Sequence, residues 1–213
     1  MEGNVVVVIG LARSGIAAAD FLARRGARVV AADAKAESAL PPEALGLRER
    51  GVLLELGAHR EETFTGAAMV VVSPGVPWEL PALAAARAKG VPVIAEIELA
   101  FRHLRGRVAA ITGTKGKSTT TAALGAMLRE AGFDARVGGN IGSPLVSLVE
   151  GSTEATAFAV EVSSFQLEGT ERFRPDVAVW LNLSPDHLDR HPSFDAYVAA
   201  KARIFARQEA GDW

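Results

Sequence analysis

The feature that most constrains the fold is an alternation of short apolar runs with segments of helical pattern, and this alternation starts twice. Residues 4–10 (NVVVVIG) and 107–112 (RVAAIT) are rich in β-branched and small apolar residues, and each leads into a glycine turn and then a helical segment. A continuous apolar run is typical of a strand buried on both faces of a parallel sheet. The pattern therefore predicts an α/β chain with two successive parallel-sheet domains.

The expected elements follow this alternation along the chain. Strands are expected over residues 4–10, 28–33, 52–56, 69–75, 91–95, 107–112, 157–162 and 177–182. Helices are expected over residues 14–25, 79–89, 96–105, 119–131 and 193–208, with a short one after the Pro-marked loop near residue 41. A boundary near residues 92–96 then gives a first domain over residues 1–93 and a second over residues 94–213. The second domain has few strands for a complete sheet.

Composition excludes several classes of chemistry. The formal net charge of -2 gives no broad attraction to nucleic acid or to an anionic membrane. The absence of cysteine removes disulfides, thiolate metal sites and thiol nucleophiles, and is typical of a reducing compartment. The apolar run at the N-terminus is too short for a signal peptide or a membrane span. We therefore expect a cytoplasmic protein without nucleic-acid or membrane partners.

The second glycine turn, residues 111–119 (ITGTKGKST), has the features of a phosphate-binding loop. The pattern G-x-x-x-x-G-K-[ST] asks for a glycine where this chain has Ile111. The loop nevertheless follows a strand and opens a helix, so its backbone N–H groups can cradle phosphate oxygens. Lys117 can reach the β- and γ-phosphates, and Ser118 can offer its hydroxyl to Mg²⁺. A plain glycine turn with a solvated lysine is the alternative.

This form of the loop, G-T-x-G-K-[ST], resembles the ATP loop of the Mur ligase family and of its relative folylpolyglutamate synthetase. The family usually carries asparagine where this chain has Lys115. Further segments resemble the family in order: GLARSG (10–15), SPG (73–75), EIELAF (96–101), GGNIG (138–142), EVSSFQLE (161–168), NLSPDHLDRH (182–191) and AAKARIF (199–205). The GLARSG and S-S-F-Q-L segments are most similar to the family member that adds D-glutamate.

The resemblance implies a function and a domain plan. It implies an ATP-dependent carbon–nitrogen ligase of peptidoglycan synthesis whose substrates are UDP-N-acetylmuramoyl-L-alanine, D-glutamate and ATP, acting through an acyl phosphate. The implied fold is a Rossmann-like UDP-substrate domain followed by a P-loop ATPase-like central domain. The family has three domains and is usually monomeric. We expect this chain to hold the first domain and a truncated second domain, and to lack ligase activity alone.

The resemblance also implies the residues of the ATP site. The ATP contacts are expected at Gly113, Thr114, Lys115, Gly116, Lys117, Ser118 and Thr119. Two Mg²⁺ ions are implied, with Ser118 and Glu161 as ligands of one, and with His187 and a carbamate on Lys201 serving the other. Lys117, Glu161, His187 and Lys201 are thus the expected catalytic residues.

The residues alone leave plainer alternatives for this set. Glu161 is then a strand-end acid, His187 a loop histidine and Lys201 a solvated helix lysine. The other histidines, His59, His103 and His191, keep such a plain interpretation.

The first glycine turn, GLARSG at residues 10–15, suggests a dinucleotide site, with Asp33 placed as a ribose-binding acid. However, Ala12 occupies the second glycine position of G-x-G-x-x-G. An NAD-dependent dehydrogenase is therefore one alternative. A family member with another substrate and a nucleotide-binding module without catalysis are two more.

The resemblance instead implies that this first domain binds the UDP part of the substrate. The backbone near Arg13 and Ser14 would hold the diphosphate at the helix N-terminus. The expected substrate contacts are Arg13, Ser14, Asp33, Lys35, Ser73 and Gly75, with Asn140 and Ser163 on the muramoyl side. Arg13 and Lys35 as ordinary surface charges remain an alternative.

Overall fold

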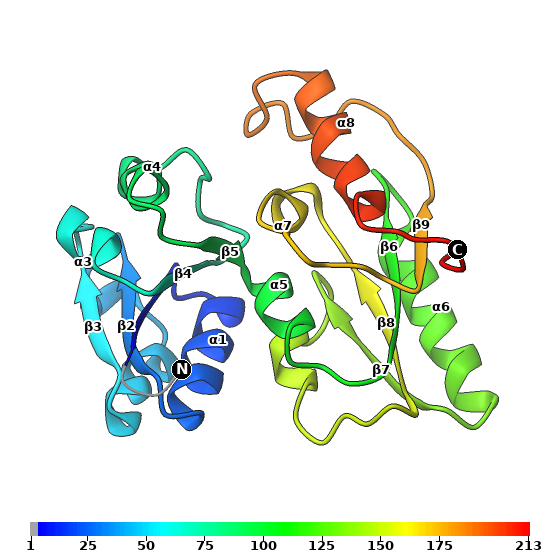
Figure 1. Cartoon of the computed structure of the whole chain (residues 1–213), viewed down its shortest axis with the longest axis horizontal. Coiled ribbons are helices and arrows are strands. Elements are labelled where there is room, and N and C mark those ends of the chain that lie inside the picture. The colour runs from blue at the N-terminus through cyan, green and yellow to red at the C-terminus, as the bar shows by residue number, and fades with distance from the viewer. Residues whose placement is uncertain (1–3) are drawn as a thin grey trace. The chain divides into compact units, whose positions relative to one another are not determined.

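The computed structural model describes residues 4–213 and divides into two compact units, one ending at Leu99 and the other beginning at Ala100. Each unit has its own parallel sheet, as Figure 1 shows in blue to green for the first unit and in green to red for the second. The α/β class expected from the sequence is confirmed. No helix among the described residues is long and apolar enough to cross a lipid bilayer.

The first unit is a five-stranded parallel sheet in the order β3-β2-β1-β4-β5. Its strands are β1 (Val5–Ile9), β2 (Arg28–Asp33), β3 (Leu53–Leu56), β4 (Met69–Val72) and β5 (Val93–Ala95). Its helices are α1 (Arg13–Arg24), α2 (Pro42–Leu45), α3 (Glu61–Thr65) and α4 (Pro81–Ala88), with 3₁₀ turns η1 (Glu37–Ala39) and η2 (Gly46–Arg50). The helix α5 (Glu96–Phe101) spans the division between the units. The strand order reverses between β1 and β4, and ligands of open α/β sheets bind at such a switch point.

Both faces of this sheet are covered, which explains its continuous apolar strands. Val7 and Ile9 of β1 pack into a buried cluster with Phe64 of α3 and Leu83 of α4. Because side chains alternate along a strand, the neighbouring valines of β1 face the opposite side, where α1 packs on the sheet.

The second unit is a four-stranded parallel sheet in the order β7-β8-β6-β9. Its strands are β6 (Arg107–Thr112), β7 (Asp134–Gly139), β8 (Thr156–Glu161) and β9 (Val177–Trp180). Its helices are α6 (Lys117–Glu130), α7 (Ser164–Glu168) and α8 (Phe194–Ala202), with 3₁₀ turns η3 (Leu145–Leu148) and η4 (Arg203–Phe205). The helix α6 packs on β6, β7 and β8, and α7 packs with α8.

Several elements differ from the sequence-based expectation. The strand β7 and the short helices α3 and α7 were not predicted. The helix expected over residues 193–208 is shorter, since α8 ends at Ala202 and continues as the turn η4. The last residue of the chain lies along the outer edge of β9, where Trp213 N–H donates to Asp176 O and Trp213 O accepts from Ala178 N–H.

Candidate functional site

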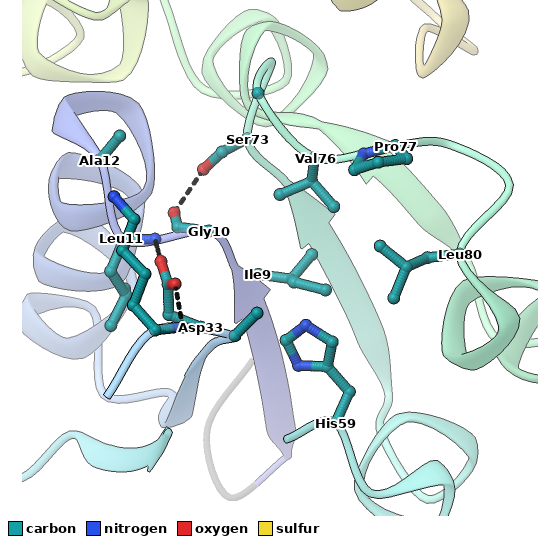
Figure 2. Close-up of a pocket in the computed structure, with 13 residues that line it drawn as sticks. Ile9, Gly10, Leu11, Ala12, Asp33, His59, Ser73, Val76, Pro77 and Leu80 are labelled. Atoms are coloured by element: carbon teal, nitrogen blue, oxygen red, sulfur yellow. Dashed lines mark hydrogen bonds between the residues drawn. The ribbon is translucent and has the colours of Figure 1, made fainter. Parts of the chain in front are cut away.

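A cavity of about 290 Å³ lies at the switch point of the first unit, at the carboxyl ends of β1 and β4 (Figure 2). Apolar side chains such as Val76 and Leu80 form much of its lining. The expected substrate residues that line it are Asp33, Lys35, Ser73 and Gly75. Arg13 and Ser14 are not among its lining residues, but they form the first turn of α1, which follows directly on the lining residue Ala12.

The turn between β1 and α1 depends on two glycines. Gly10 has φ +88°, in the left-handed region that favours glycine. A Cβ on Gly15 would lie 1.8 Å from Gly10 O, so only glycine lets α1 pack this closely. Ser73 Oγ donates a 2.7 Å hydrogen bond to the same Gly10 oxygen and ties β4 to the turn. Ala12 is the N-cap of α1 with extended backbone, so alanine is accommodated there.

The carboxylate of Asp33 shapes the cavity from the end of β2. Asp33 Oδ2 accepts a 2.7 Å hydrogen bond from Leu11 N–H, and Oδ1 accepts a 2.9 Å bond from Lys35 N–H (Figure 2). The side chain of Lys35 is exposed. The N-cap of α1, Ala12, has no side-chain capping hydrogen bond, and the N-terminus of a helix is a favourable position for an anion. The crevice therefore combines an apolar wall with the N-terminal end of a helix.

His59 is a cavity residue that the sequence interpretation missed. Its half-buried ring points into the cavity (Figure 2) and packs edge-on against Phe64, with ring centroids 5.8 Å apart. Its Nδ1 is buried without a hydrogen-bond partner. The feature of the sequence that could have identified His59 is its position just after β3, since ligand-binding residues cluster at the carboxyl ends of parallel strands.

In the second unit the loop between β6 and α6 has the shape of a phosphate-binding loop. Gly113 and Gly116 have φ values of +151° and +83°, so this loop needs its glycines. The helix α6 begins at Lys117 with Gly116 as N-cap and no side-chain cap. Lys117 Nζ donates a 3.0 Å hydrogen bond to Thr114 O, which folds the lysine back over the loop. Thr119 is exposed in the first turn of α6.

Asn182, just after β9, holds this loop from the neighbouring strand. Its Oδ1 accepts hydrogen bonds from Thr114 N–H at 3.1 Å and from Lys115 N–H at 2.9 Å. Its Nδ2 donates to Lys115 O at 2.9 Å. Asn182 lies in the segment NLSPDHLDRH that resembles the family, but it is not among the site residues expected from the sequence. We call this set of three hydrogen bonds the Asn182 clamp.

A hydroxyl and a carboxylate meet below the loop. Ser118 Oγ donates a 2.7 Å hydrogen bond to Glu161 Oε2, and Asn140 Nδ2 donates a 2.8 Å bond to Glu161 Oε1. Glu161 ends β8 and is 3% exposed. Hydroxyl and carboxylate oxygens are the ligands that Mg²⁺ prefers, so this pair fits such an ion.

Ser163 bonds to the helix that follows it. Its hydroxyl and N–H both bond to Gln166 Oε1 at 3.0 Å, and the residue is the N-cap of α7 in a capping box. The structure thus gives Ser163 a role in starting α7, and contact with a substrate stays a prediction.

Lys201 is buried beside the phosphate loop, so the alternative of a solvated helix lysine is wrong. It is 2% exposed, and its Nζ donates a 2.8 Å hydrogen bond to Gly113 O and lies 4.7 Å from the centre of the Tyr197 ring. Burial and, to a lesser extent, the charge of Lys117 lower the Lys201 pKa to about 8, while Asp186 acts in the opposite direction. Tyr197 also contacts the loop, with its hydroxyl 3.1 Å from Thr114 Oγ1.

His187 lies in the segment between β9 and α8 with φ +53°. Its side chain is half-exposed, and its ring packs edge-on against Phe165 with centroids 5.0 Å apart. Within residues 4–213, no hydrogen bond or ion pair joins His187 to Ser118, Glu161 or Lys201. The same described residues contain no cluster of three or more His, Asp or Glu side chains arranged for a metal.

Comparison with known proteins adds the decisive observation. The profile of a Mur ligase MurD-like N-terminal domain matches residues 4–95, and that of the Mur ligase middle domain matches residues 111–212. The chain belongs to the Mur ligase family. This membership contradicts the dehydrogenase alternative and agrees with the phosphate loop at β6.

Individual Mur ligases match the whole chain. It is 51% identical over 212 residues to the UDP-N-acetylmuramoylalanine--D-glutamate ligase of Acidobacterium capsulatum, covering 100% of this chain and 46% of the relative. The enzyme of the same name from Anaeromyxobacter dehalogenans is 54% identical over 213 residues, with 100% and 46% covered. The chain therefore spans about half the length of the curated relatives that it matches.

A solved Mur ligase shares the fold. The UDP-N-acetylmuramate:L-alanyl-gamma-D-glutamyl-meso-diaminopimelate ligase from Neisseria meningitides is 20% identical, with a TM-score of 0.61 over 97% of this chain and 69% of that one. This likeness supports a Rossmann-like first unit and a Mur-type central unit.

Proposed function

We propose that this chain is the UDP-substrate-binding and ATP-binding part of a ligase that adds D-glutamate to UDP-N-acetylmuramoyl-L-alanine in peptidoglycan synthesis. The observation that carries the proposal is the Ser118–Glu161 pair beneath an uncapped phosphate loop. The names of the relatives that match the entire chain support D-glutamate over another amino acid. The proposal includes a cytoplasmic, monomeric protein whose partners are small molecules rather than nucleic acid or membrane.

The chemistry accounts for the residues around the loop. A carboxylate does not react with an amine in water until it is activated, and ATP activates it as an acyl phosphate, which the amine of D-glutamate then attacks to expel phosphate. The protein mainly positions the groups and neutralises charge. The N–H groups from Gly116 to Thr119 and the ammonium of Lys117 would perform this task, because the N–H groups of Thr114 and Lys115 are bonded to Asn182.

Mg²⁺ would supply electrostatic stabilisation of the phosphate charges when bound. Ser118 and Glu161 would hold one ion, because their oxygens already lie 2.7 Å apart and Asn140 orients the carboxylate. We propose His187 for a second ion. This choice rests on the family resemblance, because imidazole is a less usual ligand for Mg²⁺ than oxygen.

We further propose a carbamate on Lys201, formed when its neutral amine adds to CO₂ and releases a proton. A buried lysine with a pKa of about 8 has a larger neutral fraction near pH 7.5 than a solvated lysine. The carbamate would replace a cation next to Lys117 with an anion that offers oxygen ligands. Its role in catalysis would be to provide these oxygens.

The cavity of the first unit would hold the UDP end of the substrate. The diphosphate would bind the first turn of α1 near Arg13 and Ser14, and the uracil would lie near Asp33 and Lys35. The ring of His59 would add a planar wall. Ser73 and Gly75 would complete the opposite side at the end of β4.

Isothermal titration of the chain tests the proposal with four ligands: UDP-N-acetylmuramoyl-L-alanine, the same compound without alanine, Mg·ATP and NADH. We expect saturable binding of the first and of Mg·ATP. Lys117→Ala should abolish ATP binding and leave the UDP-substrate affinity unchanged. Binding of NADH in place of the UDP substrate would contradict the proposal.

An assay of D-glutamate incorporation tests catalysis separately. We expect no turnover by this chain alone, because it spans about half of its relatives. Equal affinity for the UDP substrate with and without alanine would favour a family member with another substrate.

A further inference from the structure

His191 is buried in a network that a plain loop histidine would not have. It is 2% exposed, its Nε2 lies 2.9 Å from Ser164 Oγ, and its Nδ1 lies 3.6 Å from Glu168 Oε1. Its ring stacks on Phe165 with centroids 5.2 Å apart and planes within 11°. The imidazole thus contacts α7 through a hydroxyl, a carboxylate and an aromatic face.

The same residue is bonded to the backbone of His187. His191 N–H and Arg190 N–H both donate 3.0 Å hydrogen bonds to His187 O, which closes one turn of chain. His187 has φ +53°, a left-handed conformation that is uncommon outside glycine and costs on the order of 1 kcal/mol or more. Such a conformation persists only where its surroundings hold it. The ring of His187 packs on Phe165, the ring on which His191 stacks.

The Ser164–His191–Glu168 arrangement has the composition of a nucleophile, a base and an orienting acid. However, Ser164 is 1% exposed, so no substrate carbonyl can reach its hydroxyl. A hydrolytic role is therefore excluded, and a role in holding the chain remains.

We propose that His191 is a positioning residue: through Ser164, Glu168 and Phe165 it holds the turn of residues 187–191 on α7 and keeps His187 in its left-handed conformation. The purpose of this arrangement rests on the proposed function of His187. The contacts between His191 and α7 do not depend on that function. Truncating His191 should release His187 without unfolding the unit.

Nuclear magnetic resonance of the full 213-residue chain tests the arrangement without any metal. In the wild type we expect a backbone order parameter at His187 of about 0.85, as in rigid backbone. In His191→Ala it should fall below about 0.6 while amide shifts in the β-sheets stay unchanged. His103→Gln, a change at another partly buried histidine of the same unit, should leave His187 rigid.

Two further variants keep the test decisive if His191→Ala does not fold. Ser164→Ala leaves the ring stacked but removes its hydroxyl partner, and should raise the mobility of His187. His191→Gln can restore a bond to Ser164 and should recover part of the order. A folded His191→Ala or Ser164→Ala protein in which His187 is as rigid as in the wild type would overturn the proposal.

Titration with Mn²⁺ and ATP, followed by electron paramagnetic resonance, separates this inference from the proposed function. His191→Ala should weaken Mn²⁺ binding about 10-fold, the lower range for outer-shell residues. If His187→Ala weakens binding and His191→Ala does not, the positioning role fails. If His187→Ala has no effect, the proposed metal role of His187 fails, and the order of the turn alone decides the role of His191.

Discussion

The α-carbon of Gly15 packs against the carbonyl oxygen of Gly10, so closely that a Cβ would lie 1.8 Å from that oxygen and 2.6 Å from Ser73 Oγ. The first turn of α1 consequently lies directly on the end of β1. A helix N-terminus can then present its N–H groups at the mouth of the cavity. The two glycines therefore determine the position of this helix N-terminus relative to the end of β1.

Gly15→Ala should destabilise the first unit by about 3 kcal/mol or more, because the clash involves backbone that cannot move independently. It should also abolish binding of the UDP substrate. Urea unfolding and calorimetric titration measure the two effects. Gly46→Ala is the matched control, since nothing lies within 4 Å of a Cβ there, and it should change stability by less than about 0.5 kcal/mol. Equal stability of the two variants would contradict the packing argument.

Asp33→Asn should lower both the stability of the turn between β1 and α1 and the affinity for the UDP substrate. The amide replaces one of the two oxygens that accept N–H groups from Leu11 and Lys35, so one N–H faces another donor. A hydrogen bond lost from this half-buried carboxylate costs about 1 kcal/mol. We expect at least a 10-fold loss of UDP-substrate affinity in titration, with Asp195→Asn on α8 as the control. An unchanged affinity would show that Asp33 does not shape the site.

Glu161→Gln should reduce the magnesium dependence of ATP binding. The neutral amide keeps the size of the side chain but loses the charge that suits Mg²⁺. We expect the affinity for Mg·ATP to fall about 10-fold or more while the weak affinity for metal-free ATP stays the same or rises. Ser118→Ala should act in the same direction. Identical Mg²⁺ titrations of wild type and Glu161→Gln would show that Glu161 is not a ligand of Mg²⁺.

Lys201 should make stability depend on pH in the alkaline range. Its pKa is about 8 in the folded chain, against the ordinary value of 10.5. Between these values the unfolded chain binds more protons, so the free energy of unfolding should rise with pH, with a limiting slope of about 1.4 kcal/mol per pH unit. Below pH 8 the Lys201 amine is protonated in both the folded and the unfolded chain. This residue then no longer contributes to the pH dependence of the free energy of unfolding.

The comparison protein for this measurement is Lys201→Met, studied by urea unfolding in CO₂-free buffer. Subtracting its pH profile removes the contribution of other lysines and tyrosines. Parallel profiles from pH 8 to 10 would mean that the Lys201 ammonium is solvated. A separate addition of ¹³C-bicarbonate should give a carbamate signal in the wild type and none in Lys201→Met.

The sequence predicts best the elements whose structure depends on neighbouring residues along the chain. Strands β1, β6 and β8 are buried on both faces and therefore appear as uninterrupted apolar runs. The strand β7 (DARVGG) carries two charges and two glycines, and its first four residues are exposed or half-buried at the sheet edge, so its pattern is that of a loop. The phosphate loop was predictable because its shape depends on two glycines of one short segment, Gly113 and Gly116.

The contacts that complete the site are distant in sequence. Asn182 bonds to Lys115 across 67 positions, and Ser164 meets His191 across 27. Nothing in AAKARIF distinguishes a buried lysine from a solvated one, because burial depends on how α8 packs. The family resemblance selected Lys201 and His187, but it gave no role to Asn182, His59 or His191, whose contacts appear only in three dimensions.

The Asn182 clamp has a consequence for the thermodynamics of nucleotide binding. Three hydrogen bonds from one amide fix the backbone of Thr114 and Lys115 in the folded chain. The conformational entropy of the loop is thus lost when the unit folds, and little remains to be lost when a nucleotide arrives. Association then requires no slow rearrangement of the loop. The loop would accordingly have its phosphate-binding shape in the folded protein before any nucleotide is present.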